Sequence, residues 1–225
     1  KGETLGLVGE SGCGKSTLAL SIMRLMPKSS RIIGDKIIFE GEDLLRKSED
    51  ELRMIRGGKI SMIFQNPLSS LNPVFKVGDQ IAESIKIHQD LDKSKINERV
   101  IELLKKVGIS DAQKRMSSYP HQFSGGMRQR AMIAMAFSCN PKLVIADEPT
   151  TSLDVTIQAQ ILELMKDIQK EYKSSFLLIS HDFGVISELS DFVAIMYAGK
   201  VVEYSDIVSV IKYPIHPYTI ELLKS

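Results

Sequence analysis

A glycine-rich stretch near the start of the chain, residues 9–17, constrains the fold more than any other feature. It contains a glycine, four further residues and then Gly-Lys-Ser, a pattern that forms a loop around nucleotide phosphates. The apolar residues 5–8 before it predict a buried strand, and residues 17–23 after it predict a helix that ends before Pro27. Strand, loop and helix therefore occur in the order that phosphate binding requires.

Each part of this stretch has a physical role in that prediction. Glycines permit positive φ and let backbone N–H groups crowd around an anion, and the helix N-terminus adds partial positive charge. Lys15 can reach the β- and γ-phosphates, and the Ser16 hydroxyl can ligate Mg²⁺. A glycine-rich turn that fits by accident is the alternative, and the correct flanks disfavour it. The residues predicted to bind the nucleoside triphosphate are Gly9, Glu10, Ser11, Gly12, Cys13, Gly14, Lys15, Ser16 and Thr17, together with Gln65.

Composition narrows the class of protein. The formal net charge of +1 gives no overall basic field, so we expect no nucleic-acid partner. Cys13 and Cys139 lack metal-ligand spacing, and no apolar run approaches the roughly 18 residues of a membrane span. We therefore expect a protein on the cytoplasmic side of the cell, with any membrane role acting through a partner. Because the chain begins with Lys1 only a few residues before a core strand, we also expect that it is a fragment.

Apolar strands alternate with helical patterns along the chain, which predicts an α/β fold with a mostly parallel sheet. The predicted strands are residues 5–8, 36–42, 59–65, 143–146 and 176–179, followed by a hairpin of residues 192–197 and 200–204. The predicted helices are residues 17–23, 43–56, 127–138 and 155–172, with helical structure over 77–107 and a loop over 66–73.

Residues 78–123 carry many charges and no strand pattern, so we expect a helical subdomain inserted into the core. The core would then be residues 1–77 and 124–225. The alternative is that these helices are ordinary crossovers between strands.

Two acidic residues follow the apolar run 143–146. A buried strand that delivers Asp147 next to bound Mg²⁺ is the usual second half of a phosphate-loop site. Glu148, just beyond the strand, could polarise the attacking water. Since adjacent strand residues point in opposite directions, we expect these two carboxylates to have different roles. The alternative is a solvated acidic turn.

Three further motifs stand where strands end or helices begin. Ser124 is a good N-cap, and Gly125 and Gly126 expose the first N–H groups of a buried helix, which predicts a second anion site or merely a capped turn. Gln65 ends a predicted strand and can ligate Mg²⁺ or position water. His181 follows another strand and can contact the γ-phosphate, although a lone histidine there is more often structural.

At these residues the chain resembles the nucleotide-binding subunit of an ABC transporter over essentially its whole length. The glycine-rich loop resembles the Walker A loop, Gln65 the Q-loop glutamine, and Ser124-Gly125-Gly126 the signature. Residues 143–147 resemble Walker B, with Glu148 as the catalytic glutamate. Ser152-Leu153-Asp154 resembles the D-loop, and His181 the switch histidine.

The resemblance implies a P-loop NTPase (RecA-like) core and an ATPase that works as a head-to-tail dimer. The signature of one subunit would close over ATP held by the Walker A loop of the other. It implies catalytic roles for Glu148, His181 and Lys15, and Mg²⁺ held by Ser16, Gln65 and Asp147. It also implies membrane permease subunits as partners, an indirect role for a substrate-binding protein, and a peripheral location at the cytoplasmic face of the membrane.

Finer similarity points to the branch that imports oligopeptides, dipeptides or nickel. The segments that carry it are residues 65–73, residues 150–160 and His216-Pro217-Tyr218-Thr219. Phe123 and Met127 depart from the commonest signature but are similar to one of two ATPase subunits in such importers, so we expect a related second ATPase as the partner. Two family features are missing from this sequence: an aromatic residue before Walker A that stacks on adenine, and a C-terminal cysteine cluster.

Two other functions have the same motifs. A soluble ABC-type ATPase acting on DNA or ribosomes would share the site, but near-zero net charge and the importer-like segments oppose it. A regulatory nucleotide sensor without hydrolysis is disfavoured by Glu148.

Overall fold

The structure, a computed structural model, describes residues 2–151 and 153–224. It divides the chain into two units. The first unit comprises Lys1–Glu3 and Gly57–Phe176, and the second comprises Thr4–Arg56 and Leu177–Ser225. Strands and helices alternate in both, so the predicted α/β class is confirmed.

The second unit is built on strands around β1. β1 (Thr4–Val8) pairs in parallel with β7 (Phe192–Tyr197), and β7 pairs in antiparallel fashion with β8 (Lys200–Asp206). β6 (Ser175–Ser180), of which residues 177–180 belong to this unit, neighbours β1. Leu7 and Val8 are almost fully buried, as a strand covered on both faces requires. The predicted strand and hairpin are therefore confirmed.

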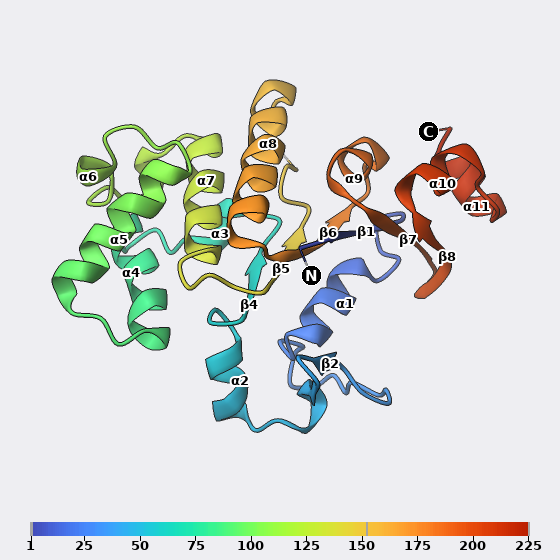
Figure 1. Ribbon diagram of the computed structural model, residues 1–225, viewed down its shortest axis with the longest axis horizontal. Helices are drawn as coiled ribbons and strands as arrows, with labels where there is room; N and C mark the ends of the chain where they lie inside the picture. Colours follow the sequence, from blue (N-terminus) through green and yellow to red (C-terminus); the bar gives the residue numbers. More distant parts are fainter. Residues whose placement is uncertain (1, 152, 225) are drawn as a thin grey trace. The chain divides into compact units, whose positions relative to one another are not determined.

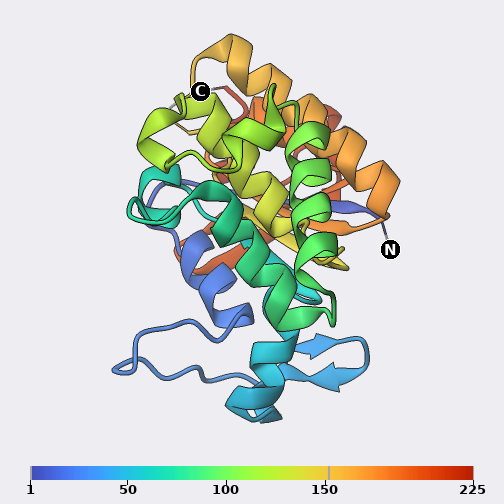
Figure 2. The ribbon, with the colours of Figure 1, turned by 90° about the vertical axis from the view of Figure 1, so that its left-hand side faces the viewer.

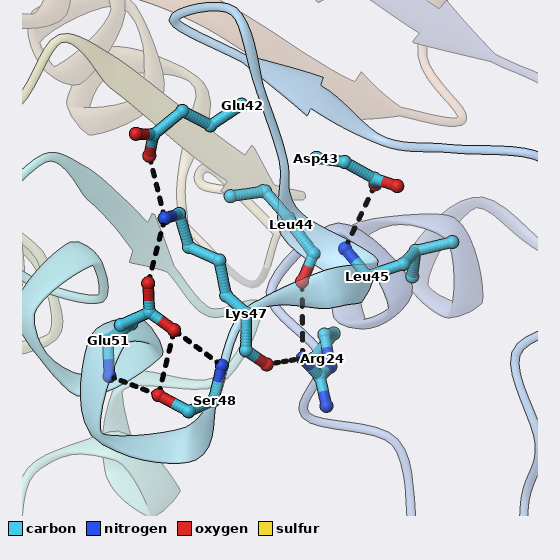
Figure 3. A network of polar contacts seen from close by, with 8 residues as sticks. All are labelled: Arg24, Glu42, Asp43, Leu44, Leu45, Lys47, Ser48 and Glu51. Carbon is cyan, nitrogen blue, oxygen red and sulfur yellow. Dashed lines mark hydrogen bonds and ion pairs between the residues drawn. The ribbon is translucent and has the colours of Figure 1, made fainter.

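Helix α1 (Lys15–Ile22) follows the glycine-rich loop and is anchored at its far end by two arginines. The Arg24 guanidinium donates to the carbonyls of Leu44 (3.1 Å) and Lys47 (2.5 Å), as Figure 3 shows. Arg56 donates to the carbonyls of Met23 (2.7 Å) and Arg24 (3.0 Å). Arg56 satisfies carbonyls just after the last turn of α1, where a cation also suits the helix dipole, and Arg24 ties the end of α1 to the segment 44–47.

The segment after α1 differs from the prediction. The expected strand over 36–42 is wrong in length: β2 (Ile38–Phe39) and β3 (Glu42–Asp43) form a short hairpin, because Glu40 and Gly41 adopt left-handed backbone between them. The expected helix over 43–56 is also wrong. It is divided into a 3₁₀ turn (Leu44–Arg46) and α2 (Glu49–Ile55).

A capping box explains where α2 begins. Ser48 Oγ accepts from the Glu51 amide (3.3 Å), and the Glu51 carboxylate accepts from the Ser48 amide (2.8 Å). These two bonds satisfy donors that the first turn of a helix leaves unpaired, and they fix Ser48 outside the helix. Figure 3 shows the box beside Lys47, whose ammonium group bridges Glu42 (2.7 Å) and Glu51 (3.1 Å).

The first unit contains the strand that delivers the acidic residues. β4 (Ile60–Ile63) pairs in parallel with β5 (Leu143–Asp147), with Ile60 opposite Leu143. α7 (Gly125–Ala136) packs against β4 and against α8 (Val155–Tyr172). α7 is buried around most of its circumference, as its apolar sequence predicts.

The remaining helices of the first unit lie between β4 and α7 in the sequence. They are α3 (Pro67–Ser70), α4 (Val77–His88), α5 (Lys93–Lys106), α6 (Ala112–Arg115) and a 3₁₀ turn, Pro120–Gln122. α4 packs along α5, and Figure 2 shows the two side by side. Helical structure over 77–107 is thus confirmed, and the inserted subdomain over 78–123 stays a prediction.

The loop expected over 66–73 is wrong in part, because α3 forms within it. The amides of Ser70 and Leu71 donate to the carbonyls of Asn66 (3.2 Å) and Pro67 (3.3 Å). Proline is compatible with the first turn of a helix, where its missing N–H would have no intrahelical partner. Pro67 therefore begins a single turn instead of preventing it.

Three short helices complete the second unit. They are α9 (Phe183–Leu189), α10 (Ile207–Lys212) and α11 (Pro217–Leu222), and Figure 1 shows their order along the chain. No helix among the described residues is long and apolar enough to span a membrane.

Candidate functional site

The glycine-rich loop connects β1 to α1 in the second unit. Gly14 has φ 109°, a left-handed conformation that glycine adopts without strain, and the Leu18 amide bonds its carbonyl (2.9 Å). The helix therefore begins at Lys15, two residues before the predicted start at Thr17. Its first N–H groups, on Lys15, Ser16 and Thr17, precede any intrahelical acceptor and are available for an anion.

Lys15 lies inside this loop. Its side chain is 5% exposed, and its ammonium group donates to the carbonyls of Gly9 (2.7 Å) and Glu10 (2.9 Å). The positive charge is thus held by the loop that would surround the phosphates. The predicted contact of Lys15 with the β- and γ-phosphates stays a prediction.

Gly9 is required by a close approach of backbone. A Cβ atom at this position would lie 2.1 Å from the Met196 carbonyl oxygen at the end of β7. No side chain can be accommodated at that distance. The first glycine of the motif therefore lets the loop leave β1 directly alongside β7.

In the first unit, Asp147 is the last residue of β5 and is 6% exposed. Glu148 follows it with φ 48°, a left-handed conformation that is uncommon outside glycine. The strand ends at Asp147, so Glu148 lies just beyond it as expected, and the different roles expected of the two carboxylates stay a prediction. The backbone turn sets the direction of Glu148, and such strained conformations cluster at functional sites.

Side chains from two other segments converge on Glu148. Its Oε2 atom accepts hydrogen bonds from Gln65 Nε2 (2.7 Å) and from Thr151 Oγ1 (2.9 Å). The predicted residues Gln65 and Glu148 are thus brought together across 83 positions of sequence. We refer to Gln65, Glu148 and Thr151 as the acidic triad.

Two details of the triad differ from expectation. Gln65 does not end a strand, because β4 ends at Ile63 and Gln65 lies two residues beyond it. Thr151 was not predicted as a site residue. Its only sequence signal is its position three residues after Glu148, at which the Thr151 amide can also bond the Glu148 carbonyl (3.2 Å).

A cavity of about 370 Å³ lies beside the triad within the first unit. Its lining includes Gln65 and Thr151 of the triad, Gly125 and Arg128 of α7, and Leu153. Gly125 is exposed, as a glycine that bares the N-terminus of α7 should be. The first unit therefore places part of the signature and part of the triad along one hollow.

The signature itself begins α7 as predicted. Ser124 is the N-cap, and its Oγ accepts from the Met127 amide (3.3 Å). A Cβ atom on Gly126 would lie 2.9 Å from Ile157 Cγ2, so this glycine allows α7 to approach α8. The signature glycines thus combine an exposed helix start with close helix packing.

Asp154 caps α8 by accepting a hydrogen bond from the Ile157 amide (2.9 Å). Its neighbour in the predicted D-loop, Ser152, lies outside the described residues. In the second unit, His181 is exposed after β6, and Asp182 caps α9 through the amides of Gly184 (2.7 Å) and Val185 (3.4 Å). The cap fixes the backbone directly after His181.

The residues expected to hold Mg²⁺ are oxygen donors, which suit that cation. The hydrogen bond from Gln65 to Glu148 uses the amide nitrogen, so the amide oxygen keeps its capacity to act as a ligand. Over residues 2–151 and 153–224, no cluster of three or more His, Cys, Asp or Glu forms a metal site. Ser16 of the second unit and Gln65 and Asp147 of the first each offer a side-chain oxygen, and their assignment to Mg²⁺ stays a prediction.

Comparison with known proteins also points to ATP-binding subunits of ABC transporters. The family model described as ABC transporter matches residues 1–151. The oligopeptide transport ATP-binding protein AppD of Bacillus subtilis is 54% identical, and the match covers all of this chain and 69% of AppD. The probable peptide ABC transporter ATP-binding protein y4tR of Sinorhizobium fredii is 51% identical, with 100% and 67% covered. The dipeptide transport ATP-binding protein DppD of Escherichia coli is 51% identical, with 100% and 69% covered.

Solved structures show the same fold. The dimeric ATP-binding cassette MJ0796, in a post-hydrolysis state bound to ADP and Pi, matches with a TM-score of 0.79 and 25% identity over 92% of this chain and 86% of that one. The protein cbiO1 of Clostridium perfringens, described as part of the ABC transporter complex cbiONQ, matches with a TM-score of 0.79 and 27% identity over 95% and 80%. The chain belongs to the ABC transporter family.

Proposed function

We propose that this chain is the ATP-binding and ATP-hydrolysing subunit of an importer that carries oligopeptides or dipeptides across the cytoplasmic membrane. One observation supports it above all: the phosphate loop holds Lys15 buried among its own carbonyls, in a chain about half identical to ATP-binding proteins of peptide transport. Nickel remains a second candidate cargo, because segment 65–73 resembles the branch of importers that carries peptides or nickel.

Phosphate binding falls to the second unit. The N–H groups at the start of α1 would bind phosphate oxygens, and Lys15 would exchange its contacts with Gly9 and Glu10 for the β- and γ-phosphates. Ser16, Gln65 and Asp147 would hold Mg²⁺, as the family resemblance implies, and the ion would supply positive charge to the site. His181 would contact the γ-phosphate.

Hydrolysis requires a water aligned with the γ-phosphate, and Glu148 is the residue that would orient it. Its left-handed backbone and its bonds to Gln65 and Thr151 hold the carboxylate in one direction. Positioning and electrostatic stabilisation account for most of the catalysis of phosphoryl transfer. The triad therefore serves the reaction by fixing the water-orienting oxygen.

The assembly that we propose is a dimer with a second, related ATPase. Ser124, Gly125 and Gly126 would contact ATP held by the other subunit, and Asp154 would lie at the same interface. Permease subunits would bind this dimer at the cytoplasmic face of the membrane, and a substrate-binding protein would act through them. The alternative of a soluble ATPase acting on DNA or ribosomes has no support from the named relatives.

The test is a single-atom change in the full-length subunit, Glu148→Gln. It keeps the size of the side chain, replaces one acceptor oxygen by a donor NH₂ group and removes the charge. We expect ATP binding unchanged within about twofold and turnover reduced by at least about 100-fold, the size of effect that loss of one positioned group produces. ATP binding and phosphate release would be measured on the subunit assembled with its membrane partners.

The matched control is Glu163→Gln on the exposed face of α8, where we expect no change. Undiminished turnover in Glu148→Gln would remove that residue from the mechanism. Wild-type turnover that rises with permease and peptide-loaded binding protein would support import. Turnover that responds to DNA or ribosomes instead would overturn it.

A further inference from the structure

The phosphate loop has a contact that its motif does not predict. In the second unit, the Glu10 amide donates a hydrogen bond to the phenolic oxygen of Tyr218 (2.9 Å), across 208 positions of sequence. Glu10 is the second residue of the loop, and Tyr218 lies in α11 near the C-terminal end of the described chain. The far end of the sequence thus touches the loop that would hold the phosphates.

Tyr218 is itself fixed by its surroundings. Its ring packs against Tyr197 at the end of β7, with 4.6 Å between ring centroids. Its amide donates to Nδ1 of His216, the N-cap of α11 (3.1 Å). Both the ring and the backbone of Tyr218 are therefore held, so its hydroxyl oxygen has a defined position.

The segment before α11 is fastened to β8 by Glu203. The carboxylate of Glu203 accepts from the amides of Ile215 (3.0 Å) and His216 (2.9 Å). Burial disfavours the charged form of Glu203, but the hydrogen bonds to it outweigh burial and hold the pKa of its carboxyl below the usual value. The ionised side chain of Glu203 in β8 therefore fixes the position at which α11 begins.

The loop also contacts the hairpin from which Tyr197 projects. The Gly199 amide, in the turn between β7 and β8, donates to the Cys13 carbonyl (3.0 Å). The hairpin and α11 therefore hold the loop at two residues, Cys13 and Glu10. Between them, Ser11 and Gly12 are exposed.

We propose that Tyr218 is a positioning residue that holds the phosphate loop ready for nucleotide, so that α11 (Pro217–Leu222) controls nucleotide affinity. A loop that becomes ordered only when its ligand binds lowers the affinity for that ligand, because conformational entropy is lost. A contact that orders the loop before binding removes part of this loss. Nothing in this role requires Tyr218 to contact ATP. The inference rests on the proposed function, since it concerns the same loop.

A phenol is chemically suited to this position. Burial raises the pKa of Tyr218, so its hydroxyl stays neutral at physiological pH. A neutral oxygen can accept a hydrogen bond from the Glu10 amide without adding negative charge beside a phosphate site. A carboxylate would make the same hydrogen bond but repel the anion.

The experiment is Tyr218→Phe in the full-length subunit, which keeps the ring against Tyr197 and removes only the hydroxyl. We expect ATP and ADP to bind about fivefold more weakly, as loss of a hydrogen bond of about 1 kcal/mol implies. The turnover rate at saturating ATP should stay unchanged while KM rises. Hydrogen exchange at the Glu10 amide should become faster in the nucleotide-free variant.

The matched control is Tyr213→Phe, at a tyrosine that is 76% exposed, and it should bind nucleotide like the wild type. Equal affinities for the wild type and Tyr218→Phe would overturn the positioning role and leave the proposed function intact. The same holds for a fall in melting temperature with no change in affinity. A wild-type chain that bound no ATP would instead contradict the proposed function.

Discussion

The phosphate loop of the second unit and the acidic triad of the first are held in different ways. The loop is held mostly through backbone groups: the carbonyls of Gly9 and Glu10 accept from Lys15, and the Cys13 carbonyl accepts from the Gly199 amide. The triad is held by side chains, with Gln65 and Thr151 each donating to one oxygen of Glu148.

This difference predicts how each region responds to change. Every residue other than proline has a backbone N–H and a C=O group, whatever its side chain. The conformation of the loop is therefore disturbed mainly by a side chain that occupies the space of these backbone contacts. Side-chain donors can be removed one at a time, and each carries a separate part of the orientation of Glu148. We therefore expect an obstruction of the loop's backbone to have a larger effect than the loss of any one side-chain hydrogen bond, in the triad or at Tyr218.

The largest effect should come from Gly9→Ala. Its new methyl group would lie 2.1 Å from the Met196 carbonyl, and backbone cannot move away as the end of a flexible side chain can. We expect ATP affinity to fall by about 100-fold, equivalent to about 2.7 kcal/mol and within the usual cost of overpacking. Calorimetric titration of ATP into the full-length subunit would measure it.

Gly34→Ala is the control for this change, because a Cβ atom there meets nothing within 4 Å. It should bind ATP like the wild type. A Gly9→Ala variant that also binds normally would show that the loop adjusts freely, and the contrast with the triad would fail.

A smaller and more selective effect should come from Thr151→Val. This substitution keeps the shape of the side chain and removes the hydroxyl that donates to Glu148 Oε2. A hydrogen bond to a charged group contributes about 1.5–3 kcal/mol, so we expect turnover to fall by about 10- to 150-fold, toward the lower end because the Gln65 amide still donates to the same oxygen. ATP affinity should change by less than about twofold, because Gln65 still holds the carboxylate. Steady-state hydrolysis and nucleotide binding, measured on one preparation, would separate the two quantities.

Thr156→Val, at an exposed position near the start of α8, is the matched control and should hydrolyse ATP normally. A fall in ATP affinity as large as the fall in turnover would contradict the separation of roles between the triad and the loop.

The same difference explains which features the sequence predicts. The loop is recognisable because close backbone approach and positive φ select glycine at Gly9 and Gly14, and these glycines are visible at fixed spacing. The buried strand ending at Asp147 is equally visible as an apolar run. Both features are determined by residues close together in the sequence, so residue type and spacing are enough to predict them.

Features that depend on distant or weakly marked contacts were not predicted. The Thr151 hydroxyl and the Gln65 amide, 86 residues earlier in the sequence, donate to the same oxygen of Glu148. No pattern of apolar residues predicts that these two side chains lie together. α3 forms although its two flanking prolines favour a loop, because Pro67 stands at the one helical position that tolerates it. The capping box of Ser48 and Glu51 is visible in the sequence as a local signal for a helix start. The helical spacing of apolar residues continues on both sides of it and therefore predicts one longer helix.

The smallest effect should arise at that capping box, where side chains support the segment behind α1. Hydrogen bonds from the amide and hydroxyl of Ser48, and then from Lys47, lower the pKa of Glu51 from 4.5 to about 2. A carboxyl with a lowered pKa stabilises the fold above its unfolded-state value and loses that contribution as pH falls toward its folded-state value. The advantage of wild type over Glu51→Gln in melting temperature should therefore be present at pH 7 and shrink between about pH 4.5 and 2.

Glu83→Gln, on the exposed face of α4, is the control for the loss of one carboxylate from a helix surface. ATP affinity of Glu51→Gln at pH 7 should equal that of the wild type, because the phosphate loop depends on its own backbone contacts. A loss of affinity at pH 7 in this variant would mean that side chains beyond the far end of α1 also shape the loop. The loop would then depend on side chains as much as the triad does, and the distinction between a backbone-held and a side-chain-held region would no longer describe this protein.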